Sequence, residues 1–183
     1  MFIQTEATPN PSTLKFLPGQ DVLGDKTANF TKAEDAESSP LAKVLFEIDN
    51  VDSVFLGSDF ISVTKSENSG WDLLKTEILT TIMEHFVSGK PVLIEDGQKV
   101  EEAPAEEDSE IVSQIKELIE TRVRPSVAQD GGDIIFHGFE NGVVKLEMHG
   151  ACAGCPSSTI TLKNGIENML KHYVPEVESV EQV

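Results

Sequence analysis

Residues 129–156 are QDGGDIIFHGFENGVVKLEMHGACAGCP, and this stretch decides the fold of the second half of the chain. Its pair Asn141-Gly142 is a strong short-range hairpin signal, because a type I′ turn needs positive φ at both central positions. Apolar residues then alternate along a return strand: Val144, Leu146 and Met148. We therefore expect a β-hairpin with one buried face, which ends at a loop that holds the cysteines.

A helix is expected before the hairpin. Apolar residues at helical spacing form one face of it: Ile111, Ile115, Leu118 and Ile119. We expect Asp108 or Ser109 to cap this helix. Arg122 and Arg124 are placed favourably near its negative end, and Pro125 is expected to close its regular pattern.

A tight turn connects this helix to the first strand of the hairpin. The run Asp130-Gly131-Gly132-Asp133 leads into a strand over residues 134–139. Paired glycines favour a tight turn, because glycine takes positive φ at little cost. A functional role for Asp130 or Asp133 is the alternative interpretation.

A second helix is expected after the cysteines, beginning near Pro156 or Ser157. Its buried stripe is formed by large side chains at helical spacing: Leu162, Ile166, Met169, Leu170 and Tyr173. Residues 177–180 add a last strand. The predicted order of elements in this half is α-β-β-α-β.

The first half also predicts an α+β domain. Strands are expected over residues 2–6 and 14–17, and a polar loop follows to Ser39. Ser39 as N-cap and Pro40 at the first helical position then start a short helix.

A hairpin and a long helix complete this half. Residues 51–56 and 60–64 predict the hairpin, with its turn at Gly57-Ser58-Asp59. The helix has an apolar stripe: Trp71, Leu74, Ile78, Ile82 and Phe86. His85 falls in this helix, and we expect it at the surface or rim rather than as a metal ligand, because no second ligand stands at a helpful spacing.

An acidic segment separates the two halves. Residues 95–108 hold seven acids and one base, a third of the net charge of -18, and have almost nothing to bury. The sequence therefore predicts two small α+β domains, residues 1–94 and 109–183, joined by an acidic flexible linker over residues 95–108.

Composition argues against two classes of partner. Nucleic acid is not expected, because phosphate binding needs a basic face and none is visible. A membrane span is not expected either, because no window approaches roughly 18 uninterrupted apolar residues. Residues 1–6 resemble neither a secretory signal nor a transit peptide. We therefore expect a cytoplasmic protein of bacterial type, or a processed form in the mitochondrial matrix.

Cys152 and Cys155 are the only two cysteines of the chain, and both precede the N-terminus of the second predicted helix. The helix dipole and free backbone amides at such a position lower the pKa of a thiol and favour the metal-ready thiolate. The hydroxyls of Ser157, Ser158 and Thr159 stand where they could donate hydrogen bonds to thiolates or inorganic sulfide.

Three uses of this pair stay open, besides an inert buried pair. A thiol-disulfide oxidoreductase also places its dithiol at a strand-to-helix junction, but only 28 residues follow Cys155, too few for the rest of a thioredoxin-like fold. A zinc site could recruit His149, but its fourth ligand would be missing. An inter-chain iron-sulfur cluster needs no further residue type, because two copies of the loop supply about four thiolates.

A family resemblance covers nearly the whole chain. In the second half it rests on four features: the run from Gln129 to Asp133, the hairpin, the run from His149 to Ser158, and the helix through Gly165 and Ile166. These resemble the C-terminal domain of NifU, the module that marks Nfu-type iron-sulfur cluster scaffolds and carriers. The first half, with residues 2–6, Thr8-Pro9-Asn10-Pro11 and residues 14–16, is similar to the accessory N-terminal domain of the same proteins.

The resemblance implies a non-enzymatic role. Cys152 and Cys155 of two protomers would bind a labile [4Fe-4S] cluster, or a [2Fe-2S] form, in a cluster-bridged homodimer. The cluster would come from cluster donors and pass to apo iron-sulfur proteins. The N-terminal domain would select these clients or donors.

Overall fold

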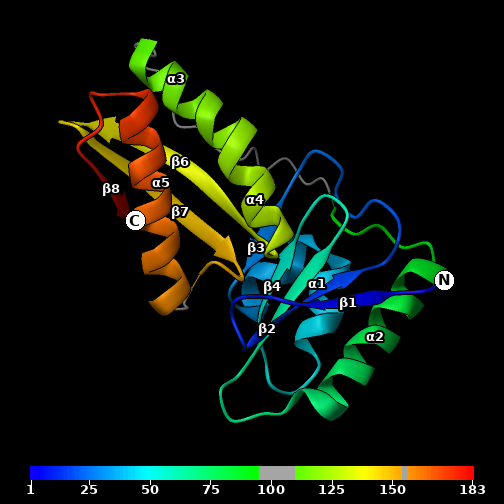
Figure 1. The fold of residues 1–183 in the computed structure, drawn as a ribbon. Helices are drawn as coiled ribbons and strands as arrows, with labels where there is room; N and C mark the ends of the chain where they lie inside the picture. The colour runs from blue at the N-terminus through cyan, green and yellow to red at the C-terminus, as the bar shows by residue number, and fades with distance from the viewer. Residues whose placement is uncertain (95–109, 154–155) are drawn as a thin grey trace. The chain divides into compact units, whose positions relative to one another are not determined.

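The computed structural model describes residues 1–94, 110–153 and 156–183, with only the backbone for 156–158 (Figure 1). The chain forms two compact units, Met1–Gly97 and Gln98–Val183. Each unit contains helices and a sheet, which confirms the expected α+β class with two domains. The predicted linker and the caps Asp108 and Ser109 lie outside the described residues. The described helices include none whose length and hydropathy would let it span a bilayer.

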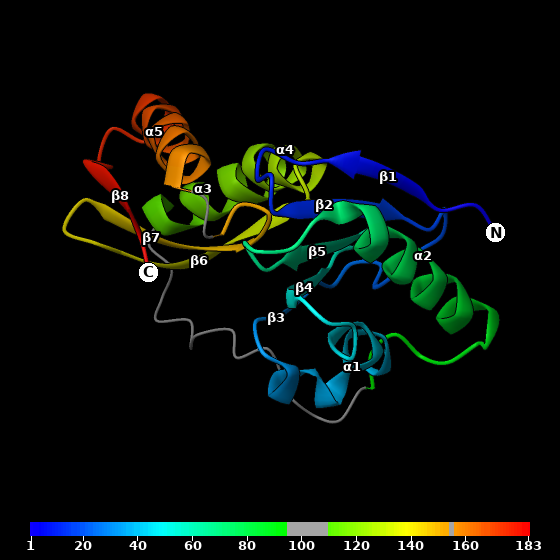
Figure 2. The same cartoon turned by 90° about the horizontal axis from the view of Figure 1, so that it is seen from below.

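The first unit is built on an antiparallel sheet, and its five described strands have the order β1-β2-β5-β4-β3 (Figure 2). The strands are β1 (Gln4–Ala7), β2 (Thr13–Leu17), β3 (Ala28–Phe30), β4 (Val51–Leu56) and β5 (Ile61–Lys65). β4 and β5 form the predicted hairpin, and the Gly57 N–H donates to the Phe60 carbonyl oxygen at 2.8 Å. Strand β3 and the 3-10 helix η1 (Ala33–Ser38) lie where a loop was predicted. The sequence did not reveal them, because both segments are short and show no regular spacing of apolar residues.

Two helices, α1 (Pro40–Phe46) and α2 (Trp71–Val87), contribute to the core of this unit (Figure 2). The predicted Ser39 cap is confirmed, because its Oγ accepts the Ala42 N–H at 3.1 Å. The same hydroxyl donates to the Val92 carbonyl oxygen at 2.6 Å, so it also ties the end of the unit to the start of α1.

His85 is buried, whereas the sequence predicted a surface or rim position. Its exposed fraction is 5%, and its Nε2 lies 3.1 Å from the carbonyl oxygen of Pro91. Residues 91–94 fold back on the unit, and the Ile94 N–H donates to the Ser38 carbonyl oxygen at 2.7 Å. This return segment is not part of the local pattern of α2, so the sequence did not reveal that His85 would be covered. Burial lowers the pKa of His85.

The first unit should lose stability as the pH falls below about 6.5, the ordinary pKa of histidine. Since burial lowers the pKa of His85 in the folded state, the unfolded chain binds the proton more readily, and acid favours unfolding. His85→Gln, which keeps a hydrogen-bond donor, should remove this part of the acid sensitivity. Urea unfolding at pH 7.5 and 5.5, followed by the fluorescence of Trp71, measures the first unit alone because the chain has one tryptophan. The same acid dependence in both proteins would contradict this role of His85.

The second unit holds a three-stranded sheet among the described residues, with the order β6-β7-β8. Its strands are β6 (Gly132–Glu140), β7 (Val143–Gly150) and β8 (Ser179–Gln182). Asn141 has φ 51° and Gly142 has φ 80°, the positive values of a type I′ turn, so the predicted hairpin is confirmed. After helix α5 (Pro156–Tyr173), strand β8 pairs parallel to β7, which gives the predicted order α-β-β-α-β.

Helix α5 buries most of its predicted stripe. Ile166 and Leu170 are buried in the core, and Leu162 and Met169 pack against it. The prediction is wrong at Tyr173, which lies at the end of the helix and is 47% exposed. The Arg122 guanidinium carbon lies 4.9 Å from the centre of its ring, in cation–π geometry.

The first helix of this unit continues past Pro125, so the predicted end is wrong. Helix α3 (Glu110–Leu118) runs through a π-helical turn, η2 (Ile119–Val123), into α4 (Arg124–Gln129). In the π-turn the Arg124 N–H donates to the Ile119 carbonyl oxygen, five residues back. Pro125 has no N–H and disrupts an α-helix at such a position, and the wider turn before it relieves this conflict.

The π-turn also keeps one side of this helix on the core. Buried residues recur at every fourth position: Ile115, Ile119, Val123 and Val127. In an α-helix of 3.6 residues per turn, a spacing of four rotates such a face by about 40° at each step. The wider π-turn rotates the face in the opposite sense. All four side chains therefore stay in the same core.

Candidate functional site

The candidate site is the loop between β7 and α5, which carries Cys152 as the sequence predicted. Gly150, the last residue of β7, has φ 65°, a left-handed conformation that turns the chain out of the strand. The Ala151 N–H donates to the Gly131 carbonyl oxygen at 3.1 Å, and the Ala153 N–H donates to the Gly150 carbonyl oxygen at 3.1 Å. The first bond fixes the loop against the turn that precedes β6, and the second closes a turn within the loop.

The second predicted ligand, Cys155, lies outside the described residues, as do the side chains of Ser157 and Ser158. Thr159 is described, and its hydroxyl donates to the Cys152 carbonyl oxygen at 3.2 Å. This hydroxyl therefore holds the backbone of the loop from the first turn of α5, instead of the sulfur that the sequence suggested as its partner.

Cys152 is a free cysteine whose sulfur packs closely against the backbone of Gly132. The residue is 6% exposed and belongs to the core of the second unit. A Cβ on Gly132 would lie 2.6 Å from the Cys152 Sγ and 2.7 Å from the His149 carbonyl oxygen, distances that no side chain tolerates without a shift. Gly132 is therefore required by a close approach, whereas its neighbour Gly131 is required by its φ of 79°.

The pKa of Cys152 is raised to about 12, the opposite of the sequence prediction. Burial is the main cause, and the negative charges of Asp130 and Asp133 add to it. The prediction was wrong because it considered the helix N-terminus and not the core into which the sulfur is packed. At neutral pH this thiol is protonated.

An ion pair that the sequence did not predict fixes the strand beside Cys152. Arg124 donates from Nε to Asp133 Oδ1 at 2.8 Å and from Nη2 to Oδ2 at 2.9 Å, and its Nη1 donates to Glu120 at 2.7 Å. Asp133 is 4% exposed, and its Oδ1 also accepts the Ile134 N–H at 2.8 Å. The bidentate pair joins α4 to the start of β6, next to Gly132. Asp133 therefore has a structural role in the site.

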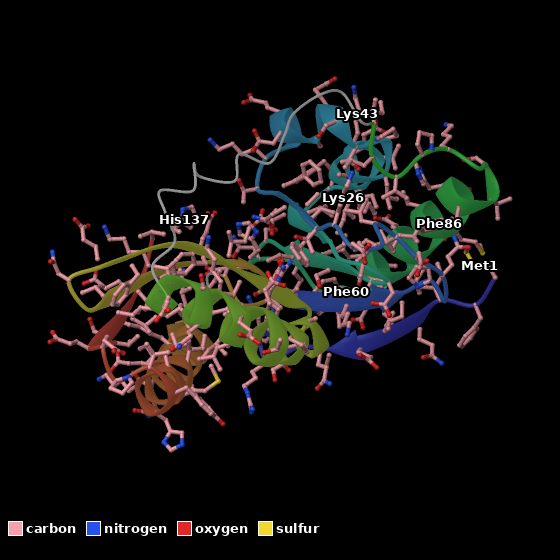
Figure 3. All side chains as sticks on the ribbon, turned by 90° about the horizontal axis from the view of Figure 1, so that it is seen from above. Met1, Lys26, Lys43, Phe60, Phe86 and His137 are labelled. Carbon is pink, nitrogen blue, oxygen red and sulfur yellow. The ribbon has the colours of Figure 1, made fainter. Side chains whose placement is uncertain are left out.

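His149 is engaged by a carboxylate next to it on the same strand. Its Nε2 lies 2.8 Å from Glu147 Oε1, and the other oxygen of Glu147 lies 2.6 Å from the Nε2 of His137, which is labelled on β6 in Figure 3. The hydrogen bond from His149, which has the larger effect, and the one from His137 lower the pKa of Glu147. Among the described residues, no three His, Cys, Asp or Glu side chains are grouped to hold a metal ion. The zinc alternative also needs Cys155, which lies outside the described residues, so it stays untested.

Two protein-family models match this chain. Residues 3–89 match the model described as the N-terminal domain of the scaffold protein Nfu/NifU. Residues 115–181 match the NifU-like domain, which includes the cysteine loop. The two matches fall in the first and second unit, respectively.

Relatives with both halves of the chain are found in flies. Over 184 residues the chain is 54% identical to a Drosophila ananassae protein and 55% identical to a Drosophila virilis protein, both named "NFU1 iron-sulfur cluster scaffold homolog, mitochondrial". The matches cover 100% of this chain and 64% and 62% of those proteins, so the chain spans somewhat less than two thirds of their length. The solution structure of a NifU-like protein from Saccharomyces cerevisiae is 26% identical, with a TM-score of 0.48 over 52% of this chain and 87% of that chain.

The contact between Gly132 and Cys152 can be tested with Gly132→Ala. The added methyl group should destabilise the second unit by about 1–3 kcal/mol, as overpacking does, and displace the sulfur from the core. With Cys155→Ser as background, alkylation of Cys152 by iodoacetamide at pH 7.5 should be slow in the parent and clearly faster in the variant, because exposure lowers the thiol pKa toward its ordinary value.

Gly138→Ala is the matched control, because Gly138 lies on the same strand and has nothing within 4 Å of an added Cβ. It should leave the alkylation rate unchanged. If Cys152 is alkylated at the same rate in the two alanine variants, the burial of its sulfur does not depend on the absence of a side chain at Gly132.

Proposed function

The chain belongs to the Nfu-type family of Nfu/NifU proteins, and we propose that it is a scaffold and carrier of iron-sulfur clusters. Its cargo is a labile [4Fe-4S] cluster, held between two protomers by Cys152 and Cys155 and delivered to apo iron-sulfur proteins. A [2Fe-2S] form is the alternative cargo. The role is binding and transfer, not catalysis.

The observation that carries this proposal is the position of Cys152 on the loop at the start of α5, in a chain with only two cysteines. Iron-sulfur clusters take about four protein ligands, so one chain supplies half of a cysteine-only site. A second copy of the same loop supplies the other half. This stoichiometry favours a homodimer that forms around the cluster.

The environment of Cys152 fits a cargo that is released. Metal binding requires the thiolate, and burial beside Asp130 and Asp133 raises the pKa of this thiol to about 12. Proton and metal therefore compete for the sulfur, and the apo loop stabilises the protonated form. A site that favours its metal-free state in this way holds a cluster less tightly than one with preformed thiolates. Loading also requires the sulfur to leave its contact with Gly132.

The same environment disfavours the alternative of a thiol-disulfide oxidoreductase. Such an enzyme needs an accessible thiolate of low pKa as its nucleophile. Cys152 is 6% exposed, and its pKa is raised. Cys152 is therefore poorly suited to be the attacking thiol, which supports a carrier over a disulfide enzyme that uses this residue as its nucleophile.

The partners of this role are cluster donors and apo iron-sulfur proteins. The relatives are named as mitochondrial proteins, which favours the mitochondrial matrix over the cytoplasm of the two locations that the sequence suggested. We assign the selection of partners to the first unit, because the cysteine pair lies in the second.

Either Cys152→Ser or Cys155→Ser should abolish stable cluster binding and leave the fold intact, because each removes two of about four ligands in the dimer. Anaerobic reconstitution of the parent should give one cluster per two chains, with Mössbauer spectra that identify its type. Light scattering should show a shift from monomer to dimer on reconstitution and its reversal by a chelator. Normal iron and sulfide in both variants, or a full cluster on a monomer, would refute the shared site.

The cluster site should be confined to the second unit. A fragment that begins at Asp108 should assemble the cluster and dimerise, whereas residues 1–94 should stay colourless. If the first unit selects partners, the fragment should transfer its cluster to some apo-proteins more slowly than the full chain does. A fragment that binds no iron and sulfide would mean that the two units share the site, and unchanged transfer to every client would remove the assigned role of the first unit.

A further inference from the structure

Helix α2 has apolar side chains on two of its faces, and only one face is covered. Leu74, Ile78 and Ile82 are buried in the core of the first unit. A second row is exposed, which we call the outer stripe: Leu73, Thr76, Thr80, Met83 and Val87. Leu73 is 81% exposed, Met83 41% and Val87 76%. Large apolar side chains at this exposure are not part of any core of the unit.

The spacing of the outer stripe is the spacing of a helix-pairing seam. Its members follow one another at intervals of three and four residues, which places them in one row along about 21 Å of helix. The Thr80 hydroxyl donates to the Thr76 carbonyl oxygen at 2.9 Å, so its hydrogen-bonding need is met within the helix. The stripe therefore presents a surface of mainly apolar character to solvent.

A groove of about 760 Å³ runs beside the first half of the outer stripe. Leu73, Thr76 and Thr80 lie along one side of it. The other side is the segment after α1, residues 47–50, which includes Ile48. The groove thus gives the outer stripe a second wall, and Ile48 adds an apolar side chain to its lining.

Every ionisable side chain that lines this groove is acidic: Glu47, Asp49 and Glu77. Glu84 continues the acidic edge along the exposed side of α2. Lys75, the lysine of this helix, does not line the groove. A second copy of α2 would bring acids against acids, which costs binding energy and argues against a homodimer through this face. A basic partner would meet opposite charge.

We propose that the outer stripe and the groove form a docking surface for an amphipathic helix of a partner protein, with Lys or Arg beside its apolar face. The apolar seam supplies the contact area, as in other helix-in-groove complexes. The acids at its edge select the basic partner and speed its association. The surface lies wholly in the first unit, so it does not depend on whether the cysteine loop holds a cluster.

Two synthetic helical peptides of roughly 18 residues, about the length of α2, test the proposal on the full chain. Both carry the same leucine stripe, and one has lysines where the other has glutamates. Methyl-13C labelling of methionine gives four signals, from Met1, Met83, Met148 and Met169. Met83 reports on the outer stripe, and Met148 and Met169 are internal controls in the second unit. The lysine peptide should shift the Met83 signal, with a Kd at least about tenfold lower than the glutamate peptide at low salt.

Single variants on the surface of α2 locate the binding site without disturbing the core. Leu73→Ser should weaken the lysine peptide about fivefold, because it removes exposed apolar contact area. Glu77→Lys should weaken it and strengthen the glutamate peptide. The matched controls are Ile160→Ser, an apolar residue of α5 in the second unit that is 60% exposed, and Glu34→Lys, an exposed acid on η1. Both controls should leave binding unchanged.

Three results would overturn the proposal. Equal affinity for the two peptides would show that the acidic edge selects nothing. If the lysine peptide shifts other methionine signals but not that of Met83, or if the control variants weaken its binding as much as Leu73→Ser does, the binding is non-specific attraction to an acidic protein. Self-association of the apo chain that Leu73→Ser abolishes would identify a second copy as the occupant. None of these results affects the cysteine site, which iron and sulfide content tests separately.

Discussion

The close approach of the Cys152 sulfur to the backbone of Gly132 is the contact on which the site depends. It requires a residue without a side chain at the start of β6 and places the thiol in the core of the second unit. Burial then raises the pKa of the thiol, and the nearby charges of Asp130 and Asp133 act in the same direction. The chemistry of the loop in its apo state thus follows from packing at one glycine.

The helix before this strand is shaped to hold the contact in place. The π-turn keeps Val127 on the same core as Ile115 and lets the chain pass Pro125 without ending the helix. Arg124, directly after that turn, makes its bidentate pair with Asp133 at the start of β6. The backbone that faces the sulfur is therefore fixed from both sides, by the helix through Arg124 and by the loop through the bond from Ala151 to Gly131.

The two units divide the properties that the proposed carrier role needs. The second unit holds the cysteine loop, whose buried, protonated thiol would compete with metal in the proposed carrier and so suit a cargo that is released. The first unit holds no cysteine, and its exposed α2 face with an acidic edge is the docking surface that we propose. Because the two surfaces share no residue, a change in one need not alter the affinity of the other.

The sequence by itself determined the features that depend on neighbours in the chain. The Asn141-Gly142 turn, the Ser39 cap and the order of elements around the cysteine loop are local, because turn φ values and caps are set within a few residues. Only the tertiary structure decided what covers a side chain. His85 is buried by residues 91–94, and the pKa of Cys152 rises because the core, not the helix terminus, surrounds its sulfur. The segment over His85 lies outside the repeat of α2, and other elements of the second unit surround Cys152, so the spacing within one helix or loop did not predict either burial.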